Sequence, residues 1–349
     1  MQDGIQPMRK PEMLRAGDTV ATVSLSGGAA GEADLRAWYQ VAKDRLRSIF
    51  GLNVVETKHC LMGREYVYQN PAARADDLME ALLDDGVKAV LLCQGGDDAA
   101  RILPYIDRAI IRDHPKVFLG FSDATIIHHI FLQQNIVSFY GPNVLTTLSE
   151  PVALHPYTVD GMRKALFSRK PIGSVQPAGI RVYEPVNWKD GLHRQRPAVS
   201  VGSYEVLQGS GRVQGCLLGG CLGPLIYMLK GTDLFPAAER WEGSILFIDG
   251  MLPYGSRSAL LHMLRGLAAC GVLSRIRGMV VSNPFAPEEE EATKGAVLTA
   301  LREEGLQELP VLYNVDFGHT APMTTLPIGV QCEINCDART FSIIESGVS

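Results

Sequence analysis

The chain has 349 residues, which is long for one hydrophobic core and fits two domains of ordinary size. Its formal net charge of −5, with Lys and Arg scattered along the chain, argues against a nucleic-acid partner. Seven Cys without regular spacing indicate reduced thiols, and no apolar run is long enough to cross a bilayer. Because the N-terminus also lacks an apolar signal core, we expect a cytoplasmic protein without membrane contact.

The first 140 residues alternate short apolar runs with helical periods. The pattern predicts strands at 19–24, 52–56, 88–93 and 117–121, and helices at 32–49, 74–83, 99–106 and 124–134. Such alternation favours an α/β fold with a parallel sheet covered on both faces. Ligands of these sheets bind at the carboxyl ends of strands, where Gly95, Gly96 and Ser122 fall.

Residues 168–212 differ from the rest because Pro and Gly interrupt every periodic pattern. We interpret them as an inter-domain linker with a substrate loop at 183–190, between an N-terminal domain at 1–167 and a C-terminal domain at 213–349. In the second domain the pattern predicts strands at 213–218, 244–248, 278–282, 311–315 and 330–344, and helices at 222–230, 257–269 and 287–304.

The apolar run before Gly120 leads to Ser122 and then directly into a helical pattern. This is the arrangement of a nucleophile elbow, in which a strand-to-helix turn exposes a serine hydroxyl. The local motif is G-x-S-x-A, whereas the usual elbow is G-x-S-x-G. A serine after a strand is also a common helix N-cap, so the motif alone leaves both interpretations open.

A serine nucleophile needs a base and an acid that orients the base. His319 is the candidate base, because it follows a strand in a loop bounded by Gly and Pro. His128 and His129 are neighbours on a helix, so we expect one buried and one exposed ring. Asp249 ends the strand at 245–248 and is the candidate acid, although a turn cap at Asp-Gly explains it equally well.

Gly95 and Gly96 allow the backbone to approach a substrate carbonyl, so N–H groups near Gly96 and at Asp123 are candidates for an oxyanion hole. The alternative is a plain strand-to-helix turn capped by Asp97 or Asp98. Trp188, an aromatic residue in a polar loop, is placed either to stack on a substrate ring or to pack on its own domain. The cysteines lack C-x-x-C spacing, so we expect no metal site.

Taken together and in this order, the segments at 95–98, 120–125, 219–222, 245–249, 316–320 and 326–329 resemble the LD-carboxypeptidase family of serine peptidases. The likeness extends over about residues 17–344 and is greater to the microcin C immunity branch than to the murein tetrapeptide branch. It implies a flavodoxin-like N-terminal domain, a swivelling C-terminal β/α domain, a homodimer and no metal or other cofactor. It also implies a Ser-His-Glu triad whose serine and histidine correspond to Ser122 and His319.

The resemblance further implies a small-molecule substrate with an amide-type bond next to a free carboxylate or a nucleotide. In the immunity branch an aminoacyl or peptidyl group is joined to an adenylate-like phosphoramidate, and a loop tryptophan, here Trp188, stacks on the base. Gly95, Asp97 and Cys221 are the other expected substrate contacts. The chain departs from the family twice, because the acid is Asp249 where Glu is usual, and Cys221 replaces an Asn that can bind substrate.

We therefore predict a carboxypeptidase-type serine hydrolase of aminoacyl or peptidyl nucleotides such as microcin C-like antibiotics, which gives resistance to them. Ser122 attacks, His319 acts as base and then acid, Asp249 orients His319, and the N–H groups of Gly96 and Asp123 hold the oxyanion. One alternative is a murein tetrapeptide LD-carboxypeptidase of peptidoglycan recycling. Another is a non-catalytic ligand-binding protein, which the Asp249 and Cys221 departures motivate.

Overall fold

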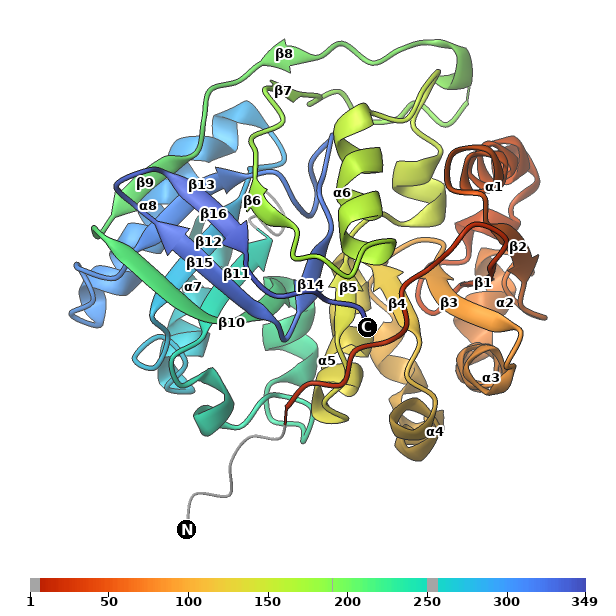
Figure 1. Cartoon of the computed structure of the whole chain (residues 1–349), viewed down its shortest axis with the longest axis horizontal. Coiled ribbons are helices and arrows are strands. Elements are labelled where there is room, and N and C mark those ends of the chain that lie inside the picture. Colours follow the sequence, from red (N-terminus) through yellow and green to blue (C-terminus); the bar gives the residue numbers. More distant parts are fainter. Residues whose placement is uncertain (1–6, 190, 250–256) are drawn as a thin grey trace.

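Two β-sheets lie side by side and form the frame of the protein (Figure 1). The structure is a computed structural model that describes residues 7–189, 191–249 and 257–349. In Figure 1 the N-terminal segments, in red to yellow, build the sheet on the right, and the segments in green to blue build most of the sheet on the left. The α/β class predicted from the alternating pattern is confirmed.

The first sheet has six strands in the order β14-β5-β4-β3-β1-β2, all parallel except β14, which runs antiparallel to β5. Its strands are β1 (Thr19–Val23), β2 (Asn53–Glu56), β3 (Val87–Leu92), β4 (Val117–Gly120), β5 (Ser138–Tyr140) and β14 (Leu326–Ile328). The helices of this half are α1 (Arg36–Phe50), α2 (Arg64–Gln69), α3 (Pro71–Leu83), α4 (Arg108–Asp113), α5 (Thr125–Gln133) and α6 (Pro156–Leu166). All four residues of β4 are buried, as expected for a parallel strand covered on both faces.

The second sheet has eight strands in the order β6-β16-β15-β10-β11-β12-β13-β9, and its four central strands β10 to β13 are parallel. Its strands are β6 (Gly173–Val175), β9 (Glu205–Gln208), β10 (Arg212–Cys221), β11 (Ile245–Asp249), β12 (Gly278–Ser282), β13 (Val311–Val315), β15 (Gln331–Asn335) and β16 (Thr340–Ile343). The helices of this half are α7 (Arg257–Ala269) and α8 (Glu290–Glu303). A separate pair, β7 (Ile180–Arg181) and β8 (Val199–Ser200), lies above both sheets in Figure 1.

Several predicted elements differ from the structure in kind. The expected helix at 99–106 is a 3₁₀ segment, Ala99–Tyr105, which contains a proline that cannot donate a backbone hydrogen bond. The expected helix at 222–230 is a short π-helix, Pro224–Leu229, and the expected strand at 330–344 is the antiparallel pair β15 and β16. Helices α2, α4 and α6 and strand β5 were not predicted, and the segment at 168–212 contributes β6 and β9 to the second sheet.

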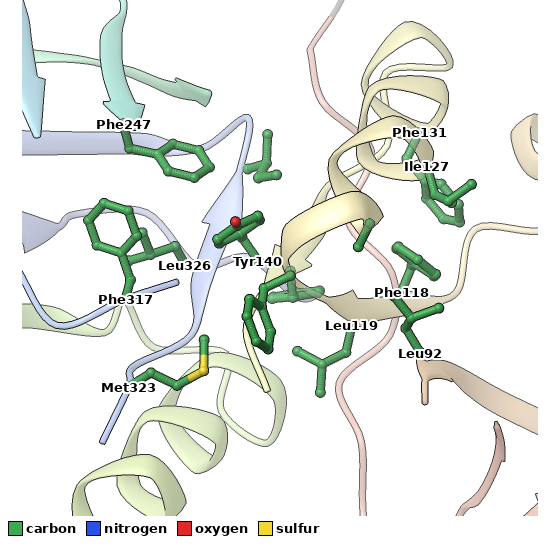
Figure 2. Packing of buried hydrophobic residues seen from close by; sticks show 14 of the residues in the cluster. Leu92, Phe118, Leu119, Ile127, Phe131, Tyr140, Phe247, Phe317, Met323 and Leu326 are labelled. Atoms are coloured by element: carbon green, nitrogen blue, oxygen red, sulfur yellow. The ribbon is translucent and has the colours of Figure 1, made fainter. Parts of the chain in front are cut away.

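The two sheets share one continuous core, because the C-terminal part of the chain returns to add β14 to the first sheet. Figure 2 shows the ring of Tyr140, from β5, among aromatic and aliphatic side chains that come from both sheets. The ring centroid of Tyr140 lies 5.4 Å from that of Phe247 on β11, and Phe247 lies 5.7 Å from Phe317. The carboxyl ends of β4, β5 and β11 therefore meet at one place. Within the described ranges, no helix has the length and apolar character needed to span a membrane.

Candidate active site

Ser122 occupies the turn between β4 and α5 with a left-handed backbone, at φ +68°. This conformation is unfavourable for a residue with a side chain and persists where surrounding contacts hold it. Three hydrogen bonds do so: the Ser122 N–H donates to Tyr140 Oη at 3.1 Å, the Phe121 N–H donates to Asn143 Oδ1 at 3.0 Å, and Thr125 Oγ1 donates to the Ser122 carbonyl at 2.7 Å. The turn therefore has the strained strand-to-helix geometry of a nucleophile elbow.

Ser122, His319 and Asp249 lie in one hydrogen-bonded chain, although they are far apart in the sequence. His319 Nε2 is 3.0 Å from Ser122 Oγ, and His319 Nδ1 is 2.7 Å from Asp249 Oδ2. Asp249 is buried at the end of β11, and His319 lies in the loop after β13. This order of hydroxyl, imidazole and carboxylate can move a proton from the serine to a base whose orientation the acid fixes.

The shorter carboxylate of Asp249 reaches His319 directly because the loop backbone approaches it closely. Gly318 has φ +77°, and a Cβ built on it would lie 2.4 Å from Asp249 Oδ2. Only glycine fits there. Burial by itself raises the pKa of Asp249, but the charge of His319 and hydrogen bonds from His319 and Tyr140 outweigh it and lower the pKa below its ordinary value. The acid is therefore ionised beside the imidazole.

Tyr140 is a member of the site that the sequence reasoning missed. Its hydroxyl donates to Asp249 Oδ2 at 2.7 Å and accepts the N–H of Ser122 at 3.1 Å, so it links the acid to the elbow. Burial, and next the charge of Asp249, raise the pKa of Tyr140 well above its ordinary value, so the hydroxyl keeps its proton. The available signal was the short apolar run ending at Tyr140-Gly141 after the elbow helix, which resembles the other strand ends.

The turn at Gly95 and Gly96 packs directly against the elbow. A Cβ on Gly95 would lie 2.9 Å from Ser122 Cβ and 3.5 Å from the backbone N of Asp123, and a Cβ on Gly96 would lie 2.5 Å from Ser26 Oγ. The contacts of 2.9 Å at Gly95 and 2.5 Å at Gly96 are too short for any residue but glycine. The predicted meeting of these glycines with Ser122 at one rim of the sheet is confirmed, and it brings backbone groups of the turn next to the serine.

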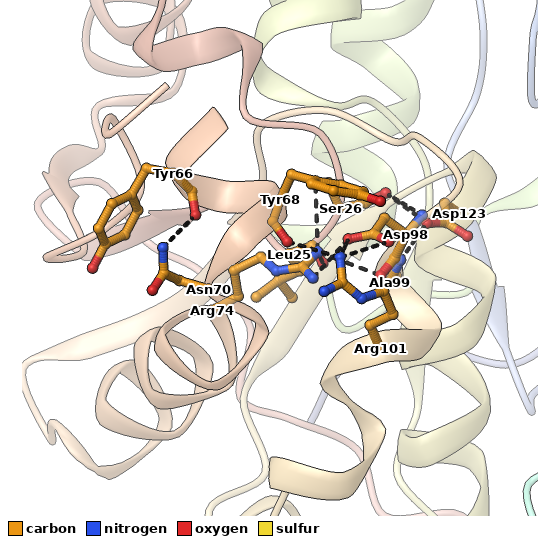
Figure 3. Close-up of polar contacts among 10 residues, drawn as sticks. All are labelled: Leu25, Ser26, Tyr66, Tyr68, Asn70, Arg74, Asp98, Ala99, Arg101 and Asp123. Carbon is orange, nitrogen blue, oxygen red and sulfur yellow. Dashed lines mark hydrogen bonds and ion pairs between the residues drawn. The ribbon is translucent and has the colours of Figure 1, made fainter. Parts of the chain in front are cut away.

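A buried polar network behind this turn fixes its position (Figure 3). Asp123 Oδ2 accepts hydrogen bonds from Ser26 Oγ at 2.6 Å and from the Ala99 N–H at 2.8 Å. The fully buried Arg74 donates to Asp98 Oδ2 at 2.8 Å and to the Leu25 carbonyl at 3.0 Å. The side chain of Asp123 thus fastens the elbow to the turn, in addition to the backbone role expected for this residue.

A cavity of about 330 Å³ opens over the serine and histidine. Its lining comes from strand ends, from the segment after β5 and from the linker, and comprises Gln94, Gly95, Gly96, Phe121, Ser122, Asn143, Thr146, Thr147, Glu150, Val182, Tyr183, Glu184, Pro185, Val186, Trp188, Arg196, Phe285, Gly318, His319, Thr320 and Ala321. The Trp188 ring packs edge-on against Trp38 with centroids 4.8 Å apart, and Trp38 Nε1 donates to the Trp188 carbonyl at 3.1 Å.

The residues expected to contact substrate fall into two groups. Gly95 and Trp188 line the cavity. Asp97 is exposed, and Cys221 is buried on β10, where it pairs with Asp249 of β11. Neither residue lines the cavity. The structure thus brings Ser122, His319, the glycine turn and Trp188 to one cavity, and Asp97 and Cys221 are not part of its lining.

Cys221, Asp249 and His319 offer potential metal-ligating atoms within 4.8 Å of one another. Two features of the site favour the hydrogen-bonded relay over metal binding. Both ring nitrogens of His319 already contact Asp249 and Ser122. Burial, and next the charge of Asp249, raise the pKa of the Cys221 thiol well above its ordinary value, and a protonated thiol is a poor ligand.

Comparison with protein families gives two matches along the chain. Residues 20–141 match the N-terminal domain of the LD-carboxypeptidases, and residues 214–334 match their C-terminal domain. The first matched range contains Ser122, and the second contains Asp249 and His319. Together they cover more than half of the chain.

Individual relatives agree over nearly the full length. The chain is 28% identical to the microcin C7 self-immunity protein MccF of Escherichia coli, over 96% of both chains. It is 29% identical to a probable murein peptide carboxypeptidase of Bacillus subtilis, over 97% of this chain and 95% of that one. The crystal structure of an MccF-like protein from Streptococcus pneumoniae in complex with AMP superimposes with a TM-score of 0.85 at 27% identity, over 93% of this chain and 98% of that one.

Proposed function

This chain belongs to the LD-carboxypeptidase family of serine peptidases, and from that premise we propose that it hydrolyses the amide or phosphoramidate bond of aminoacyl or peptidyl nucleotides. The observation that carries the proposal is the hydrogen-bonded chain from Ser122 through His319 to Asp249, which opens into the same cavity as Trp188. Microcin C-like antibiotics are compounds of this class, so the activity would give resistance to them.

In this proposal Ser122 Oγ attacks the acyl carbonyl while His319 Nε2 takes its proton. Asp249 holds Nδ1 of His319 and stabilises the imidazolium that forms. Backbone N–H groups at Gly96 and Asp123 hold the negative oxygen of the tetrahedral intermediate. His319 then returns the proton to the leaving nitrogen, and water releases the acyl group from Ser122 by the reverse sequence.

Two observations support a nucleotide as the leaving group. The S. pneumoniae relative was crystallised in complex with AMP. In this chain Trp188 lines the cavity, and its carbonyl and ring are held by Trp38. An indole fixed at the wall of a cavity offers a flat face for a purine base.

Ser122→Ala tests the proposal. With an aminoacyl sulfamoyl adenosine as substrate, we expect hydrolysis to fall by about a thousandfold or more, because the nucleophile is removed. Thermal unfolding and calorimetric binding of the same compound should stay close to wild type, and a fluorophosphonate probe should label the wild type alone. Retained turnover in Ser122→Ala would contradict the assignment, and absence of labelling in the wild type would favour a non-catalytic ligand-binding protein.

The second candidate function is removal of the terminal D-alanine from a murein tetrapeptide. It is favoured by the 29% identity to the B. subtilis protein named as a probable murein peptide carboxypeptidase. Incubating the wild type with the tetrapeptide and with an aminoacyl sulfamoyl adenosine separates the two functions, because the compound that is consumed identifies the leaving group.

We propose further that the protein acts in the cytoplasm as a homodimer. All seven cysteines are free thiols, and five of them are buried, which suits a reducing compartment. The dimer is supported by the family resemblance alone. Sedimentation at several protein concentrations measures it, and a concentration-independent monomer would contradict it.

A further inference from the structure

The cavity wall beside the elbow carries buried polar atoms that the fold leaves without a hydrogen-bond partner. Within the described part of the chain, these are Asn143 Nδ2, Thr146 Oγ1 and Gln94 Oε1. All three residues line the cavity, and Asn143 is only 1% exposed. Leaving a buried polar group unpaired is unfavourable, so a ligand that pairs with it gains affinity.

The orientation of the Asn143 amide is fixed by the elbow itself. Asn143 Oδ1 accepts the N–H of Phe121 at 3.0 Å, so the other end of the amide, Nδ2, is the donor that remains. The segment that carries Thr146 is fastened to the strand end that carries Gln94, because the Leu145 N–H donates to the Cys93 carbonyl at 2.8 Å. The three unpaired groups therefore belong to one wall next to Ser122.

The two carboxylates that line the cavity are already paired with arginines, Glu150 with Arg196 and Glu184 with Arg194. Arg196 donates to both carboxylate oxygens of Glu150, and its remaining nitrogen donates to the Glu184 carbonyl at 2.6 Å. Glu150 and Arg196 are 5% and 9% exposed. Because this carboxylate is neutralised by its partner, it offers little to the free ammonium group of a substrate.

We propose that Asn143, Thr146 and Gln94 form an acyl-side subsite for a neutral peptide unit, so that the enzyme prefers peptidyl to aminoacyl substrates. Asn143 Nδ2 and Thr146 Oγ1 donate to the carbonyl oxygen of the unit, and Gln94 Oε1 accepts its N–H. A substrate with a free α-ammonium group places a charge against neutral groups and gains less. The inference rests on the proposed function, because Trp188 is taken to bind the leaving nucleotide and leaves this wall to the acyl group.

The test compares a dipeptidyl sulfamoyl adenosine with the aminoacyl sulfamoyl adenosine that carries the same residue at the scissile bond. We expect the wild type to favour the dipeptidyl compound by about tenfold in kcat/KM, the effect of one or two buried hydrogen bonds. Asn143→Asp keeps an oxygen that accepts from Phe121, removes the free donor and adds a carboxylate charge, and Thr146→Val keeps the shape of the side chain. Each should reduce the preference by about fivefold or more, and Gln94→Met should do the same.

Thr325→Val is the matched control, because Thr325 Oγ1 is also buried without a partner in the described structure but does not line the cavity. It should keep the wild-type preference. Binding of both compounds to Ser122→Ala, measured by calorimetry, reports the preference without turnover. The subsite is overturned if the wild type binds both compounds equally or if the Asn143 and Thr146 variants keep the preference. Failure of the hydrolase proposal is a separate outcome, in which Ser122→Ala binds selectively but the wild type turns over neither compound.

Discussion

The two walls of the cavity are built in different ways. One wall consists of strand ends and the turns that follow them, with Ser122 after β4. Asp249, at the end of β11, does not itself line the cavity and supports this wall through hydrogen bonds with Tyr140 and His319. The other wall is the segment around Trp188, within the range 168–212 that the sequence pattern predicts to be a linker, and it has short strands and exposed residues. It is attached to the first half of the protein by the Glu150–Arg196 ion pair and by Trp38.

This difference separates the chemistry from recognition of the leaving group. A triad needs groups held within fractions of an ångström, and parallel strand ends packed in a common core provide that rigidity. Recognition of a base and a leaving group tolerates more variation and is placed on a loop held by a few contacts. Changes to the triad should therefore reduce kcat, and changes to the linker wall should raise KM.

The largest effect is expected for Asp249→Asn. An amide cannot stabilise the imidazolium and favours the wrong tautomer of His319, so kcat should fall by about a thousandfold or more with little change in KM. Asp249→Glu is the informative companion, because it restores the usual acid of the family. Since Gly318 already lies against this carboxylate, the extra methylene has no room, and we expect kcat to stay at least about tenfold below wild type. Wild-type activity in Asp249→Glu would show that the loop adapts.

On the opposite wall, Trp188→Ala should raise KM for an aminoacyl sulfamoyl adenosine by about tenfold and change kcat by less than about twofold. The physical reason is loss of stacking, which stabilises the bound ground state and the transition state alike. Trp188→Phe keeps a ring and should recover most of the affinity. A fall in kcat without a rise in KM would place Trp188 in the chemistry and remove the distinction between the walls.

The smallest expected effect is on stability, and it comes from residues behind the strand-end wall. His128 and His129 lie on α5 behind the elbow, and burial lowers their pKa values to about 3 and about 4. Because both lie below the ordinary value, the unfolded chain binds more protons at mildly acid pH. The contribution of the two neutral rings to the free energy of unfolding should therefore be fully present above about pH 6.5. As the pH is lowered, the free energy of unfolding should fall, by about 2 kcal/mol per histidine at pH 5.

Urea unfolding at pH 7 and pH 5 measures this dependence. His128→Gln and His129→Gln should each make the loss of stability smaller, and His193→Gln, which changes an exposed residue of the linker wall, should leave it unchanged. Equal pH dependence in the wild type and both buried-site variants would contradict the linkage to these rings.

The same two histidines show where sequence reasoning stopped. Their spacing on a helix predicts one buried and one exposed ring, but both are buried. His128 contacts Ser138 Oγ and the Gly120 carbonyl, while His129 Nε2 lies 3.3 Å from the Gly219 carbonyl on β10 of the other sheet. Helix α5 is covered on two sides because the second sheet packs against it, and periodicity within one helix carries no information about that second partner.

Elements with a strong local pattern could be predicted, and elements that depend on distant partners could not. Strands β3, β4 and β11 are continuous apolar runs and were found within one or two residues. Strand β14 is three residues long and contains a proline, so nothing in its sequence marks it as a strand. It forms because β5 presents a free edge to it. Tyr140 escaped notice for the same reason, since its role depends on Asp249 arriving from the second sheet.

The sequence by itself determined which groups stand at the ends of strands: a serine on a tight turn, an aspartate after a buried run and a histidine in a glycine loop. These are local features, since the hydrophobic period and the turn residues that produce them act over a few residues. Only the tertiary structure decided that the three groups touch, that Gly318 lets a short acid reach its base, and that Tyr140 joins them. Those hydrogen bonds connect residues 70 to 197 positions apart, and packing of the two sheets in one core is what brings them together.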